Sequence, residues 1–147
     1  MVRRRWMLLA LVWLPLVALG PGCSSMGLVP EPGYEELDRS VDAFTKFFRW
    51  KQYAKAKLFV VPNRERAFVK FTQSVENVLD ITEFSVDDVT IDEKDEKAGL
   101  RTEGHALVRL SYTLLPSNVY HVKVIEQIWI AKDGQWMLEF PDKGWDL

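Results

Sequence analysis

Apolar residues in the segment from Tyr34 to Arg49 recur at helical spacing. Successive members of the stripe lie four, three and four positions apart, and they are Leu37, Val41, Phe44 and Phe48. Residues at these intervals fall on one face of an α-helix. Two acids, Glu35 and Glu36, occupy the first turn, where the helix dipole favours negative charge. The pattern therefore predicts an amphipathic helix with a well-covered apolar face.

Two further helical segments are expected, at Trp50–Phe59 and at about Asn63–Val78. We predict a bend or break near Arg49–Trp50, with one continuous helix through this point as the alternative. Pro62 disfavours helix in the residue before it and is compatible with the start of the next helix. The third segment should bury Phe68, Phe71, Val75 and Val78.

The spacing of apolar residues falls to two after Val78, which is typical of strands. The alternation from Leu79 to Asp92 slips twice, and an extra residue in a strand flips its faces in this way. We therefore predict one long strand with bulges near Thr82-Glu83 and Asp87-Asp88. A charged turn, 93–99, and a second strand ending at Leu114 follow.

The segment from Val119 to Phe140 predicts two strands joined at Asp133-Gly134, a strong hairpin signal. A two-residue turn pairs Lys132 with Gln135, whereas a three-residue loop with a Gly134 bulge pairs Ala131 with Gln135. The longer loop separates apolar from mixed positions more cleanly, so we favour it. The favoured register aims Glu126 into the core and leaves Ile125, Trp129 and Met137 on the other face.

The N-terminus has the layout of an export signal: three arginines at 3–5, then the apolar run Trp6–Gly20. This run is shorter than the ~20 residues that a spanning helix needs. With Cys23 after it, the segment resembles a bacterial lipoprotein signal, although Gly20 and Pro21 depart from the usual pattern. An ordinary cleaved signal and an uncleaved anchor are the alternatives. We predict a signal at 1–22, acylation of Cys23 by chains such as palmitate, and a tether at 23–33.

The remaining residues, 34–147, suffice for one domain with one core. All of the 21 Asp and Glu residues follow Pro30, and three of the 19 Lys and Arg residues lie in the predicted signal. The mature chain is therefore more acidic than the formal net charge of −2, which disfavours binding to nucleic acid. One cysteine excludes an internal disulfide, and two histidines are too few for a His-based metal site. We expect no metal and no cofactor.

Three helices followed by a long antiparallel sheet resemble the nuclear-transport-factor-2-like superfamily, which includes the SnoaL and ketosteroid-isomerase shapes. The resemblance rests on three stretches: Val41–Phe44, the Tyr53–Pro62 helix and stop, and the Trp129–Trp136 segment around Asp133-Gly134. It implies an α+β fold with three N-terminal helices packed on a curved four-stranded antiparallel sheet, cone-shaped and cystatin-like. Members of this superfamily include enzymes and binding modules, and many dimerise through the outer face of the sheet.

A pocket inside such a cone would use Glu126 as a base and the hydroxyls of Tyr112 and Tyr53 as donors, beside Trp50. A buried carboxyl has a raised pKa, which suits a base. The simpler interpretation is that Glu126 pairs with a basic side chain or lies outside. An interface through Trp129, Met137 and Ile125 is the other candidate, because this apolar face is larger than a monomer needs.

We therefore expect a non-catalytic binding or assembly module, anchored through lipidated Cys23 at the periplasmic face of the outer membrane. The prediction of the outer rather than the inner membrane rests on Ser24, the residue after Cys23. The module would meet a protein partner, a second copy of the chain or a small ligand through the cone or the sheet face. The alternatives are a small isomerase or dehydratase, or a small-molecule carrier, using Glu126 and Tyr112, and a purely structural envelope protein.

Overall fold

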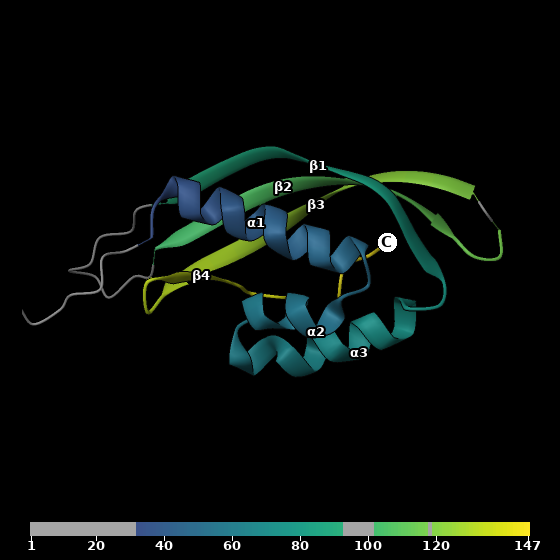
Figure 1. The fold of residues 1–147 in the computed structure, drawn as a ribbon, viewed down its shortest axis with the longest axis horizontal. Helices are drawn as coiled ribbons and strands as arrows, with labels where there is room; N and C mark the ends of the chain where they lie inside the picture. Colours follow the sequence, from purple (N-terminus) through teal and green to yellow (C-terminus); the bar gives the residue numbers. More distant parts are fainter. Residues whose placement is uncertain (1–31, 93–101, 118) are drawn as a thin grey trace, which may run out of the picture.

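The computed structural model describes residues 32–92, 102–117 and 119–147. The predictions about the export signal, Cys23 and the charged turn at 93–99 fall outside these residues. Helices precede strands along the chain (Figure 1), in the order α1 (Tyr34–Arg49), α2 (Tyr53–Ala56), the 3₁₀ turns η1 (Lys57–Phe59) and η2 (Pro62–Arg64), α3 (Glu65–Val75), β1 (Leu79–Asp92), β2 (Glu103–Leu114), β3 (Val119–Lys132) and β4 (Gln135–Leu138).

The four strands form one antiparallel sheet in the order β1-β2-β3-β4. Figure 1 shows the long strands bent over the helices, so the sheet has an inner face toward the helices and an outer face away from them. The predicted α+β class and the four-stranded antiparallel sheet are confirmed. No helix within the described ranges is long and apolar enough to cross a membrane.

Helix α1 carries the predicted apolar stripe, and all four of its members are buried against the sheet and the other helices. The predicted bend is confirmed: α1 ends at Arg49, and Lys51 has a positive φ of 54° before α2 begins. The third helix is shorter than expected, because a 3₁₀ turn precedes it and α3 ends at Val75. The expectation that Val78 is buried is wrong, since this residue lies beyond the helix and is 39% exposed.

Both predicted bulges in β1 are present, as shifts in pairing between Ile81 and Glu83 and between Val86 and Asp88. The first bulge also joins β1 to the end of α1. The carbonyl of Thr82 accepts a hydrogen bond from the Arg49 guanidinium. The hydroxyl of Thr82 donates a hydrogen bond to the carbonyl of Ser111 at 3.0 Å. Bulges bend a strand, so these two positions let β1 follow the helices.

The favoured register of the last hairpin is wrong. Lys132 pairs with Gln135, and Ala131 pairs with Trp136. The turn residues Asp133 and Gly134 have φ of 51° and 75°, as a type I′ two-residue turn requires. A one-residue change of register exchanges the two faces of a strand, so Glu126 lies on the outer face while Trp129 and Ile125 lie inside.

Aromatic rings fill the space between the inner face and the helices. Phe44 of α1 is completely buried and lies at ring-centroid distances of 5.9–6.5 Å from five other rings, which are Phe48, Phe59, Phe68, Trp129 and Trp145. Such contacts add stability beyond the area that they bury. The core of this domain is therefore a connected aromatic cluster.

The C-terminal tail closes this cluster at the turn before Trp145. Gly144 has a φ of 76°, and a Cβ added to it would lie 2.3 Å from the ring of Phe71. The Trp145 ring in turn packs against Phe140 at 4.9 Å and Phe48 at 5.5 Å. A side chain at position 144 would therefore displace either the tail or α3.

We predict that Gly144→Ala lowers the free energy of unfolding by about 2–4 kcal/mol, from the cost of positive φ and of overpacking. Gly33→Ala is the control, because Gly33 has a negative φ and meets only the end of the Glu36 side chain. Urea unfolding of both variants measures the difference. Equal stability of the two variants would show that the Gly144 turn does not hold the tail.

Candidate functional site

The four residues of the predicted pocket do not converge. The Glu126 side chain is 58% exposed on the outer face, and its Oε1 lies 3.1 Å from Nδ1 of His105. Tyr112 is buried on the inner face, where its ring stacks on His121 at 5.3 Å. The expectation that Glu126 points into the core is wrong, because the hairpin turn sets the opposite face.

Tyr53 and Trp50 lie at the helical side of the molecule. The Tyr53 ring packs against Phe48 at 5.7 Å, and burial together with the charge of Glu76 raises the pKa of its hydroxyl. Trp50 is 61% exposed, with the guanidinium of Arg49 at 5.2 Å from its ring. Neither side chain faces Glu126, so Glu126 does not share a site with the Tyr53 hydroxyl.

The inner face holds polar groups of its own around Gln127, which is 1% exposed. Its Oε1 accepts a hydrogen bond from Nε1 of Trp129 at 3.2 Å. Its Nε2 and the Nε1 of Trp145 have no partner among the described residues. The surrounding aromatic cluster leaves these groups inside a packed core, where a buried polar group normally finds a partner.

The predicted interface is only partly at the surface. Trp129 and Ile125 belong to the core, at 0% and 6% exposure, and Met137 is half-buried opposite Ile130 on the outer face. The expectation that Trp129 and Ile125 form an outer surface is wrong for the same reason as for Glu126. Burial of the large Trp129 side chain removes more apolar area from water than burial of a valine would.

The outer face carries instead a set of apolar side chains that we name the outer apolar stripe. Its members are 36–51% exposed and are Leu107, Val122, Val124 and Ile128. Leu107 lies opposite Glu126 in the β2–β3 pairing, so Val124 and Ile128 are its diagonal neighbours. Sequence reasoning missed this stripe because it assigned these β3 residues to the core.

Charged pairs lie beside and within the outer apolar stripe. Nη2 of Arg109 lies 2.6 Å from Oδ2 of Asp87, and this hydrogen bond with that of Ser85 holds the pKa of the Asp87 carboxyl below its usual range. His105 lies between Glu126 and Asp92, whose Oδ2 is 3.7 Å from its Nε2. These pairs are largely at the surface, so each contributes little to the stability of the fold.

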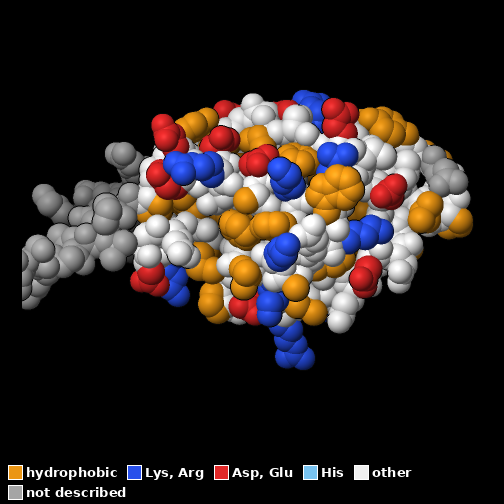
Figure 2. Space-filling model, in the orientation of Figure 1, with side chains coloured by type: hydrophobic (Ala, Val, Ile, Leu, Met, Phe, Trp, Pro, Cys, Tyr) orange, Lys and Arg blue, Asp and Glu red, His pale blue; other side chains and the backbone are white. Residues whose placement is uncertain are grey.

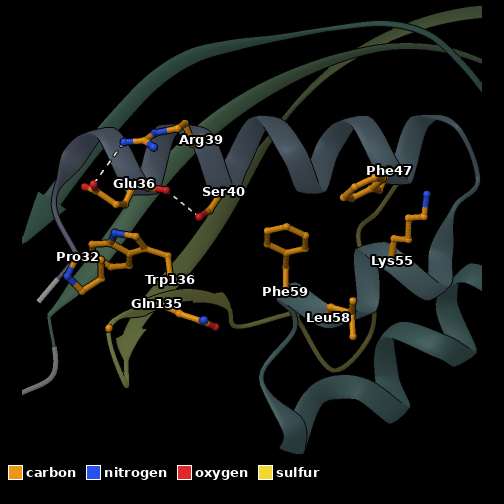
Figure 3. Close-up of a pocket in the computed structure, with 11 residues that line it drawn as sticks. Pro32, Glu36, Arg39, Ser40, Phe47, Lys55, Leu58, Phe59, Gln135 and Trp136 are labelled. Atoms are coloured by element: carbon orange, nitrogen blue, oxygen red, sulfur yellow. Dashed lines mark hydrogen bonds and ion pairs between the residues drawn. The ribbon is translucent and has the colours of Figure 1, made fainter. Parts of the chain in front are cut away.

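A separate groove of about 770 Å³ lies between α1, the α2–η1 segment and the β3–β4 turn (Figure 3). Phe47 and Phe59 line it near α2, and Pro32 and Trp136 line its other end. Nε1 of Trp136 donates to the carbonyl of Gly33 at 3.1 Å, which fixes that end. Of these lining residues, Phe47 is the one that lies next to the predicted apolar stripe of α1.

No group of three or more His, Cys, Asp or Glu side chains within the described ranges is placed to hold a metal ion.

The domain presents two surfaces that could bind other molecules, the outer apolar stripe and the groove, on either side of a packed core. Figure 2 shows that hydrophobic side chains on the helical face gather between α1 and α2, with Lys and Arg side chains among them.

No protein-family model matches the chain, and a search of curated proteins finds no match. Among solved structures, the chain is similar to a "putative polyketide cyclase" from Xanthomonas campestris pv. campestris. The two share 15% sequence identity, with a TM-score of 0.44, over 73% of this chain and 91% of that chain. A likeness of this extent carries no information about activity, substrate or partner.

We predict that Arg109→Gln raises the pKa of the Asp87 carboxyl toward its ordinary value. The carboxylate loses its largest stabilising hydrogen bond in this variant, so it takes up a proton at a higher pH. Carboxyl ¹³C NMR during an acid titration measures the shift. Lys123→Gln is the control, because Lys123 pairs with Asp146 and not with Asp87. An unchanged Asp87 titration in Arg109→Gln would contradict the pairing.

Proposed function

We propose that this chain is a non-catalytic assembly module of the bacterial envelope, with a nuclear-transport-factor-2-like domain that docks on a protein through the outer apolar stripe. The support for the superfamily is the element order, in which helices are followed by a bent four-stranded antiparallel sheet. The partner is either a second copy of the chain or another envelope protein.

The observation that carries this proposal is the pattern on the outer face of β2 and β3. Four neighbouring apolar side chains are exposed there, although the same strands bury Trp129 and Ile125 on the inner face. Exposed apolar side chains with polar groups among them are typical of protein–protein contacts. The Asp87–Arg109 and His105–Glu126 pairs supply these polar groups, and Glu126 lies directly opposite Leu107.

The catalytic alternative with Glu126 and Tyr112 lacks this kind of support. The two side chains lie on opposite faces of the sheet, and Tyr112 stacks on His121 within the packed interior. A general base must come within hydrogen-bond reach of the proton that it removes. A small molecule held between Glu126 and Tyr112 would have to cross the sheet.

A photo-crosslinking residue at position 124, in the full chain within intact envelopes, is expected to form a defined protein adduct. An adduct at twice the mass of the chain indicates a second copy, and any other discrete mass indicates a different protein. The same residue at position 69 is the control, because Val69 is 37% exposed on α3. Adducts at both positions, or at neither, would contradict docking through the stripe.

Val124→Glu should abolish this complex without unfolding the domain. Val124 is 43% exposed, so a charge there costs little in the free chain but would be desolvated in the complex. Size-exclusion chromatography with light scattering, applied to the detergent-solubilised full chain, measures the loss, and circular dichroism checks the fold. Val69→Glu should leave the complex intact.

Anchoring through Cys23 is the second part of the proposal. We predict that Cys23→Ala prevents incorporation of an alkyne-labelled palmitate and moves the protein away from the outer-membrane fraction, because acyl chains supply the anchor. Intact-mass spectrometry of the wild-type chain should find an acylated Cys23 as its first residue. A wild-type chain that begins at another residue without acylation would contradict the anchor.

A further inference from the structure

The groove between α1, η1 and β4 has the composition of a small-molecule site. Its floor and wall are mostly apolar, and they include Phe47, Phe59 and Trp136. Leu58, at its lower edge, is 74% exposed and adds a further apolar side chain to the lining. The volume of about 770 Å³ lies within the roughly 300–1,000 Å³ of ordinary ligand sites.

The groove is long rather than round. Figure 3 shows Trp136 and Pro32 at one end, Phe59 in the middle, and Phe47 with Lys55 at the other end. An extended apolar chain would contact ring faces along this whole length. A compact polar ligand would contact only part of this mostly apolar lining, so the shape favours a linear apolar body.

The two cations of the groove, Arg39 and Lys55, have different surroundings. Arg39 is matched by two carboxylates, with Nη2 at 3.3 Å from Glu36 and 3.6 Å from Glu35. Lys55 makes no ion pair within the described ranges, and its Nζ instead lies 5.5 Å from the centre of the Phe47 ring. The groove therefore presents one available positive charge, at one end of an apolar surface.

We propose that this groove binds an unbranched alkyl carboxylate, with the chain along Phe59 toward Trp136 and the carboxylate at Lys55. A single negative group matches the single unmatched cation, and the chain covers the exposed Leu58 and the rings. This site is separate from the outer apolar stripe, so the proposal goes beyond assembly and does not depend on it.

The test uses the full chain in envelope membranes and a dodecanoic acid that carries a photoreactive diazirine on its chain and a terminal alkyne. After irradiation, mass spectrometry locates the label on peptides of the protein. The label is expected on peptides that contain Phe59 or Trp136. Unlabelled dodecanoate should reduce the labelling, whereas dodecyltrimethylammonium, with the same chain and the opposite charge, should not.

Two variants separate specific binding from general partition into the membrane. Lys55→Glu and Leu58→Asp should each reduce labelling about threefold or more, because one reverses the charge and the other places a charge against the chain. Both side chains lie at the surface, so neither change should unfold the domain. Lys70→Glu is the matched control, since Lys70 lies on α3 outside the groove and should change nothing.

Three results would overturn the proposal. The first is labelling that maps elsewhere on the chain, and the second is equal labelling of Lys55→Glu and Lys70→Glu. The third is stronger displacement by dodecyl phosphate than by dodecanoate, which would assign the site to a phosphate head group. The assembly proposal is unaffected by any of these, because its crosslink is at position 124.

Discussion

The backbone conformation of two residues, Asp133 and Gly134, determines which side of the sheet becomes the core. Both have positive φ, and a two-residue turn of this kind twists in the same sense as the strands that it joins. Because side chains alternate along a strand, the length of this turn fixes the face of every residue in β4 relative to β3. Trp129 and Leu138 then become opposite neighbours inside, and both are fully buried.

The inner face is occupied as a consequence of this register. Trp129 meets Phe44 of α1 and Phe59 of η1, at 6.0 Å and 6.5 Å between ring centres, and Trp145 closes the cluster from the tail. These rings fill the space between the inner face and the helices in the described part of the chain. Surfaces outside the core are therefore the places where this domain can meet other molecules, and the outer apolar stripe and the groove are two such surfaces.

The sequence predicts the local features of this fold better than it predicts which face of each strand is buried. The α1 stripe, the break after Arg49 and the two β1 bulges follow from spacing alone, since helix and strand periodicities are local properties. The hairpin register does not, because valines and isoleucines at even positions of β3 compete with Trp129 and Ile125 at odd positions. A pattern that is apolar on both faces does not specify a register.

The same ambiguity explains why the predictions for Glu126 and Trp129 are wrong. The favoured turn assigns Glu126 to the core and Trp129 to the surface, so both errors have a single cause. The groove is not predictable from the sequence for another reason: it brings together Pro32, Phe59 and Trp136, which are far apart in sequence. Phe47 lies next to the apolar stripe of α1, but helical spacing alone does not connect it to Pro32 or Trp136.

The position of Gly33 connects the groove to the proposed anchor. Its carbonyl accepts the Trp136 indole N–H, and its own N–H donates to the Glu36 carboxylate at 3.1 Å, so the start of the domain is fixed at the Trp136 end of the groove. Nine residues separate Gly33 from Cys23, and the ten steps of chain between these two residues extend at most ~35 Å. An acylated Cys23 would therefore hold this end of the groove close to the bilayer, which is a source of long alkyl chains. Lys55 lies at the other end of the groove, so an alkyl carboxylate in the proposed orientation has its charged group at the end farther from this tether.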